Sequence, residues 1–230
     1  MSERFAVYFA PAHESPWWQL GARWMGRDEL RDAALPQEPP PGVDAARFAA
    51  LTAEARRYGL HATLKAPLRL REGANEALLC ERLAALAARL RALPLGPLAP
   101  VWMDGFLALT PAQPSAALAA LAAACVTELD DLRAPPTAAD IARRNPDALD
   151  PRGRQLLAEY GYPHVLERFR FHMTLSGQID SGTAQQWIAH LTPRVAALNA
   201  THPLILDRLC LFCETRPGSP FVRIHEEVLE

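Results

Sequence analysis

Apolar and polar residues alternate most regularly over positions 60–68 of the chain. The polar positions of this stretch are His61, Thr63 and Lys65, and leucines and alanines separate them. A period of two is typical of a β-strand with one buried face. We therefore expect the imidazole, the hydroxyl and the ammonium to stand in a row, opposite a hydrophobic face.

The same alternation returns far downstream, at positions 169–177. The polar positions there are Arg170, His172, Thr174 and Ser176, and phenylalanine, methionine and leucine fill the positions between them. Both stretches thus contain His-x-Thr-Leu, with the histidine and the threonine two residues apart on one face of a strand. This repetition is the most informative feature of the sequence.

The remaining hydrophobic pattern predicts further strands and helices. Strands are expected over 4–10, 101–109, 204–213 and 221–228. Helices are expected over 16–25, 44–56, 74–93, 114–132 and 181–198. Ser15 followed by Pro16 is typical of a helix start, and Asp180 or Ser181 is expected to cap the last helix.

Positions 133–162 differ from the rest, because prolines and charged residues interrupt them. We interpret this segment as a helical insertion, since it is too small to hold a core of its own. The chain is then one domain over 1–230, made of two lobes with one His-x-Thr strand each. The expected fold class is α+β, with antiparallel sheets, flanking helices and a central cleft between two pseudo-symmetric lobes.

Composition and charge narrow the possible partners. The 230 residues are 50% hydrophobic and 22% charged, and the net charge of −2 argues against a long nucleic acid as the ligand. A small anionic ligand needs only a few local cations. No membrane span or secretory signal is expected, which predicts a cytoplasmic protein with reduced cysteines and leaves the oligomeric state open.

Two histidines that face each other across a cleft suit the hydrolysis of a phosphodiester. One neutral ring takes a proton from water, and one protonated ring gives a proton to the leaving oxygen. Thr63 and Thr174 could donate hydroxyls to phosphate oxygens, while Lys65 and Arg170 could offset negative charge. Because side chains fill every role, we expect no metal and no cofactor.

The doubled motif, His61 to Leu64 and His172 to Leu175, resembles that of the two-histidine (2H) phosphoesterase superfamily. This superfamily includes bacterial RNA 2′,3′-cyclic phosphodiesterases and the 2′-5′ ligase-like proteins. The resemblance implies a bilobal α+β fold and metal-free catalysis. It also implies that the two histidines are the acid–base pair and that the two threonines bind phosphate.

Further stretches resemble one branch of that superfamily, uncharacterised proteins encoded beside phosphonate-degradation genes. These stretches are 5–11, 17–21, 26–28, 58–67 and 160–172. The resemblance implies a substrate that is a cyclic phosphate on ribose or a related phosphoribosyl ester. Tyr8 and either Tyr160 or Tyr162 are candidates for lining the substrate pocket, although packing is the simpler role for each.

Several alternatives remain open at this stage. The enzyme could act on RNA ends as a 2′,3′-cyclic phosphodiesterase or ligase, or the cleft could serve a phosphate sensor without turnover. Lys65 could be solvated, and Arg170 could pair with Glu167 or another acid. Cys210 and Cys213 have Cys-x-x-Cys spacing, but in a strand these positions point to opposite faces, which disfavours zinc or redox chemistry.

Overall fold

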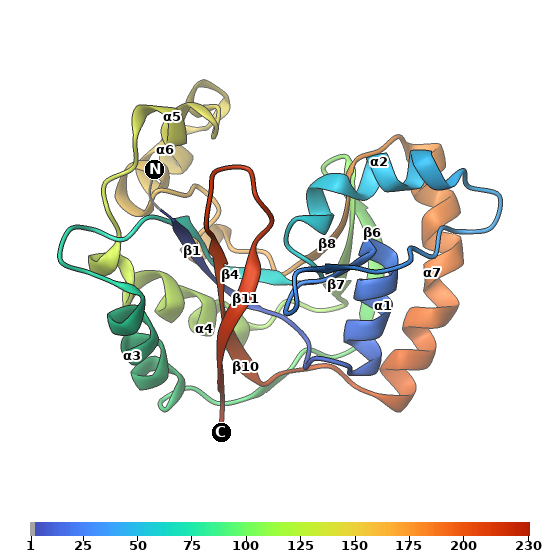
Figure 1. Cartoon of the computed structure of the whole chain (residues 1–230), viewed down its shortest axis with the longest axis horizontal. Coiled ribbons are helices and arrows are strands. Elements are labelled where there is room, and N and C mark those ends of the chain that lie inside the picture. The colour runs from blue at the N-terminus through green and yellow to red at the C-terminus, as the bar shows by residue number, and fades with distance from the viewer. Residues whose placement is uncertain (1–2) are drawn as a thin grey trace.

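Two antiparallel sheets form the framework of the computed structural model, which describes residues 3–230 (Figure 1). The first sheet has the strand order β11 (Val222–Val228), β10 (Arg208–Glu214), β1 (Arg4–Phe9) and β4 (Ala62–Leu68). The second has the order β6 (Leu98–Met103), β7 (Phe106–Pro111) and β8 (Met173–Gln178). His61 directly precedes β4 and His172 directly precedes β8, so each sheet carries one His-x-Thr segment. The predicted α+β fold with antiparallel sheets is confirmed.

Five long helices cover the two sheets. The helices α1 (Pro16–Met25), α2 (Ala45–Arg56) and α7 (Ser181–Thr201) pack on the second sheet, and α3 (Glu76–Ala87) and α4 (Ala116–Thr127) pack on the first. The caps agree with the sequence: the Ser15 hydroxyl accepts a hydrogen bond from the backbone N–H of Trp18, and Asp180 caps α7. The third helix ends at Ala87 rather than at Leu93, because Leu93 and Pro94 (β5) pair with β9 (Ile205–Leu206).

The two lobes are not the two halves of the sequence. Strands β10 and β11 return from the C-terminal end to join β1 and β4, while α1 and α2 from the N-terminal part pack near β8 (Figure 1). Each lobe is therefore assembled from both ends of the chain. Each of the two predicted lobes is present and has one His-x-Thr strand. The chain, however, crosses between the lobes more often than it would if each lobe were one continuous half of the sequence.

Residues 133–162 form a helical segment beside the first sheet. It contains α5 (Ala138–Ala142) and α6 (Pro151–Tyr160), together with a short 3₁₀ turn, Pro146–Ala148. The segment is attached to the sheet by an ion pair between Arg69 and Asp140 and by the backbone bond from Ala134 N–H to the Arg69 carbonyl. Leu156 packs into a small separate core with Val126. This segment therefore forms one wall above the edge strand β4.

A large hydrophobic core lies between the sheets and their helices, and its largest members are aromatic. Trp24 meets Phe48 and Trp187 edge to face, with ring centroids 4.9 and 5.4 Å away. The Trp24 indole also donates a hydrogen bond of 2.8 Å to the carbonyl of Leu175 in β8. These contacts fix the strand that follows His172. Within residues 3–230, no helix combines the length and the apolar character that crossing a membrane requires.

Candidate active site

The ring of His61 is oriented by the backbone just before it. Its Nδ1 lies 3.0 Å from the carbonyl oxygen of Gly59. A carbonyl can only accept, so in the neutral ring Nδ1 carries the hydrogen and Nε2 keeps its lone pair. Gly59 has φ +72°, a backbone conformation that side chains disfavour, and this turn carries its carbonyl under the ring.

His172 repeats this arrangement in the second lobe. Its Nδ1 lies 2.8 Å from the carbonyl oxygen of Arg170, again two residues upstream. The ring packs against Phe106, with the centroids 5.7 Å apart. Both imidazoles therefore present Nε2 away from their own backbone. The repeat seen in the sequence is a repeat of hydrogen-bond geometry as well.

Burial keeps both imidazole rings neutral. His61 is 8% exposed, and the rings of Tyr8 and Tyr58 lie 4.2 and 5.3 Å from it between centroids. The pKa of His61 is lowered to about 4, chiefly by burial and to a smaller extent by the nearby His172. The pKa of His172 is also lowered, first by burial and then by the positive charge of Arg170. At neutral pH both rings are uncharged, which leaves a lone pair on each Nε2.

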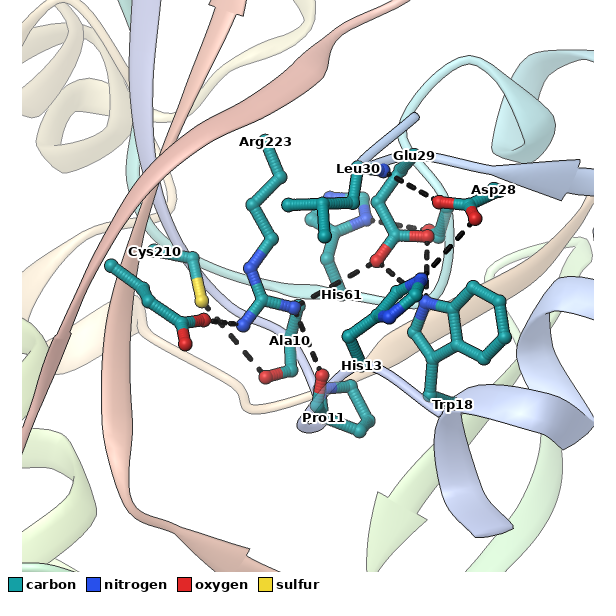
Figure 2. A network of polar contacts seen from close by, with 12 residues as sticks. Ala10, Pro11, His13, Trp18, Asp28, Glu29, Leu30, His61, Cys210 and Arg223 are labelled. Carbon is teal, nitrogen blue, oxygen red and sulfur yellow. Dashed lines mark hydrogen bonds and ion pairs between the residues drawn. The ribbon is translucent and has the colours of Figure 1, made fainter. Parts of the chain in front are cut away.

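A buried polar network supports the backbone behind His61 (Figure 2). The Glu29 carboxylate accepts a hydrogen bond of 2.9 Å from the Trp18 indole and lies 3.9 Å from a guanidinium nitrogen of Arg223. Arg223 also donates to the carbonyl of Pro11, which fixes the end of β1. A Cβ atom on Gly59 would stand only 3.1 Å from Glu29. The network and the positive φ together restrict this position to glycine.

One cavity of about 250 Å³ joins the two motifs. His61, Thr63, His172 and Thr174 all line it, although they come from two different sheets. An adjoining cavity of about 400 Å³ shares Thr63 and His172 with the first. Both threonine side chains are half-buried. The structure therefore brings together the four residues that the sequence singles out as an acid–base pair with two hydroxyls.

Lys65 lies outside this cavity, and the expectation of one polar row is wrong for it. A β-bulge sets two residues of β4, Leu64 and Lys65, against Val7 of β1, whereas Thr63 pairs with Tyr8. Lys65 thereby joins the buried face. Its ammonium donates to the Val126 carbonyl at 2.8 Å and to Asp130 at 2.9 Å.

The other predicted residues are divided between neighbouring cavities. Tyr8 lines the cavity of the two histidines, and burial raises its pKa well above the ordinary value. Arg170 lines the adjoining one, where it pairs with Asp104 rather than with Glu167. Tyr160, the last residue of α6, lines a third cavity instead.

Several residues that line the histidine cavity are missing from the predicted set of site residues, among them Arg4, Glu54, Tyr58, Arg144 and Tyr162. Tyr162 lines the two neighbouring cavities as well and was one of two tyrosines considered from the sequence. Arg144 carried no signal in the sequence, because its position depends on how the segment 133–162 packs.

In the part of the chain that the structure describes, the cysteines and the possible metal ligands form no second centre. Cys210 and Cys213 are both buried in β10 but belong to different hydrophobic clusters, so they lie on opposite faces of the sheet, as predicted. Among residues 3–230, no three histidine, cysteine, aspartate or glutamate side chains gather as a metal ion would require.

Comparison with known proteins identifies the family. A family model described as "Protein of unknown function (DUF1045)" matches residues 63–222, which is more than half of the chain. The chain belongs to the DUF1045 family. Two curated relatives, from Janthinobacterium sp. (strain Marseille) and Laribacter hongkongensis (strain HLHK9), are both named "Ribose 1,5-bisphosphate phosphokinase PhnN". Each is 39% identical over 95% of this DUF1045 chain, which spans about half the length of either relative (49% and 50%).

Solved structures resemble this DUF1045 protein distantly. Structures of E. coli LigT in complex with NADP+ and with 3′-AMP cover 100% of this chain and 99% of the LigT chain. The sequence identities are 15% and 16%, and the TM-scores are 0.39 and 0.41. At this distance the likeness carries no information about individual side chains. The chemistry of the site has to follow from the residues of this chain.

Proposed function

We propose that this protein is a phosphodiesterase that hydrolyses a small cyclic phosphate on ribose, or a related phosphoribosyl ester, by two-histidine acid–base catalysis. One observation carries the proposal. His61 and His172, each held through Nδ1 by a carbonyl two residues upstream, line a single cavity together with Thr63 and Thr174. A structural histidine on a strand has no need of such a matched partner.

The reaction consists of one displacement at phosphorus. The Nε2 lone pair of His61 takes a proton from water while the water oxygen bonds to phosphorus. The bond from phosphorus to the ester oxygen breaks, and His172 gives that oxygen a proton from Nε2. His61 suits the role of base because its pKa of about 4 keeps it neutral. His172 is less buried and is therefore easier to protonate.

The bound substrate itself prepares the acid. A phosphodiester is an anion, and an anion beside an imidazole favours the protonated ring and raises its pKa. The hydroxyls of Thr63 and Thr174 donate to the two non-bridging phosphate oxygens, on which charge grows in the transition state. This scheme calls for no metal and no cofactor, since side chains supply the acid, the base and the hydrogen-bond donors.

The expected substrate is small. The cavity of about 250 Å³ is near the lower end of the volumes that hold organic ligands, roughly 300 Å³ and above. The curated relatives carry a name that refers to a ribose bisphosphate, and this chain matches only about half of each. A phosphorylated ribose agrees with both observations and with the resemblance to a branch linked to phosphonate degradation.

A hydrolysis assay in EDTA tests the proposal. The substrates are ribose 2,3-cyclic phosphate, 2′,3′-cyclic AMP and a short RNA that ends in a 2′,3′-cyclic phosphate. Turnover should be lost in both His61→Ala and His172→Ala. His190→Ala is the matched control, because this half-buried histidine lies on α7 away from the cavity, and it should keep full activity.

Other outcomes separate the alternatives. Faster turnover of the RNA than of the small esters would favour an enzyme that acts on RNA ends. Tight binding of the cyclic phosphates without turnover would favour a phosphate sensor. Activity that survives the loss of either histidine would overturn the acid–base scheme.

A further inference from the structure

A second, strongly basic cavity adjoins the one that holds the histidines. It lies between the edge strand β4 and the helical segment 133–162. The two cavities share Arg4, Arg144 and Tyr162 in their common wall. A ligand whose cyclic phosphate lies beside the histidines can therefore extend toward these cations.

The charges in this second cavity do not balance. Six cationic side chains line it: Arg4, Lys65, Arg69, Arg133, Arg143 and Arg144. Three carboxylates pair with five of them, because Asp130 is shared by Lys65 and Arg133, Asp140 is shared by Arg69 and Arg143, and Glu214 pairs with Arg4. The whole chain has a net charge of −2, so this surplus of positive charge is local. A surplus of this kind attracts an anion.

Arg144 is the cation in this wall that is available for a ligand. Within residues 3–230, no carboxylate lies within ion-pair distance of it, whereas the five other cations of the cavity are paired. Its guanidinium carbon lies 4.6 Å from the centroid of the Tyr162 ring. Such a cation–π contact holds the guanidinium in place and leaves its N–H donors free. Tyr162 lines all three cavities, so the guanidinium that stacks on it lies beside the cavity of the two histidines.

We infer that Arg144, stacked on Tyr162, forms a second anion subsite that binds a terminal phosphate of the substrate while the histidines act on its cyclic phosphate. This inference rests on the proposed function and narrows the substrate to a compact sugar with two phosphoryl groups. The planar guanidinium can donate two parallel N–H hydrogen bonds to two oxygens of a phosphate. The surplus positive charge of the cavity compensates the negative charge of a phosphate dianion. The segment 133–162 then acts as a specificity element, because it supplies Arg144 to a site whose reacting groups lie on the two sheets.

Steady-state kinetics with a matched pair of substrates test this subsite. The pair is ribose 2,3-cyclic phosphate and its 5-phosphorylated form, which differ by one phosphate. Arg144→Gln should raise KM for the 5-phosphorylated substrate about ten- to a hundredfold, and should change KM for the other less than about twofold. Arg152→Gln is the control, since Arg152 lies on the same segment but pairs with Glu167 outside the cavities. It should leave both values of KM unchanged.

The outcomes distinguish the subsite from the proposed reaction. If the wild type hydrolyses both substrates with equal KM, or if Arg144→Gln affects both equally, the subsite is overturned and the hydrolase stands. If nothing is hydrolysed, calorimetric titration with pyrophosphate provides an independent test. Binding that is lost in Arg144→Gln and kept in Arg152→Gln then supports the subsite, and equal binding by the two variants overturns it.

Discussion

Mild acid should destabilise the folded protein through His61. In the unfolded chain this ring has the ordinary pKa of 6.5, whereas burial in the fold lowers its pKa to about 4. Between these two values the unfolded chain takes up a proton that the folded protein does not. The free energy of unfolding therefore falls as the pH decreases from 6.5 toward 4, and the contribution of His61 is fully present only above pH 6.5.

The size of this effect follows from the difference between the two pKa values. Each pH unit corresponds to about 1.36 kcal/mol, so the full difference corresponds to about 3 kcal/mol. At about pH 4.5 the folded ring is still mostly neutral, and the expected loss is about 2.5 kcal/mol. Other groups also titrate over this range, so the contribution of His61 has to be isolated by subtraction.

Urea unfolding of the wild type and of His61→Asn provides that subtraction. The asparagine amide can replace Nδ1 as the donor to the Gly59 carbonyl, and it carries no charge at any pH. Between about pH 7.5 and pH 4.5, the wild type should lose about 2.5 kcal/mol more than the variant. Parallel losses in the two proteins would refute the argument that His61 is held neutral by burial.

Three further predictions concern catalysis. The ratio kcat/KM should fall as the pH rises through the pKa of His172, because the catalytic acid must be protonated. Burial holds this pKa below 6.5. A pH–rate profile with its optimum above neutrality would contradict the prediction. Thr63→Val and Thr174→Val keep the shape of the side chain and remove its hydroxyl. Each variant should lower kcat/KM about tenfold and leave the circular dichroism spectrum unchanged. Unchanged kinetics would exclude a role of the hydroxyl in phosphate binding. Gly59→Ala should cost about 1–2 kcal/mol in urea unfolding and also lower kcat. Gly73→Ala, at φ +79° with only the Arg71 side chain in ordinary contact, should affect stability alone. Equal kcat in both variants would show that the Gly59 carbonyl does not position the ring.

The sequence was sufficient to predict the two strands and what they carry. The period of two around His61 and His172 arises because one face of each strand is buried and the other faces the cavity. Each residue of the strand therefore has to suit one of these two environments. The repeated motif also predicted that the two strands lie in related environments. Both histidines are bound to a carbonyl two residues upstream, so the repetition reflects local backbone geometry as well as side-chain type.

The sequence was not sufficient where a contact depends on a distant partner. The bulge that turns Lys65 into the buried face depends on how β4 pairs with β1, and no glycine or proline between Thr63 and Lys65 marks it. Arg144 follows a helix of only five residues whose position is set by the ion pair between Arg69 and Asp140. Neither feature has a periodic signal that a single sequence could reveal.

The interleaving of the two lobes has a consequence for how the chain folds during synthesis. Strand β1 lies between β4 and β10, so one side of β1 stays unpaired during synthesis until residue 214 has emerged. Contacts over such a sequence separation form slowly, because a long loop must close before they can form. The sheet that carries β8 has all its strands by residue 178 and can be completed first. A fragment cut between the two motifs would therefore leave His61 with only β1 and β4 of its four-stranded sheet, and the two histidines cannot be studied in separate halves of the chain.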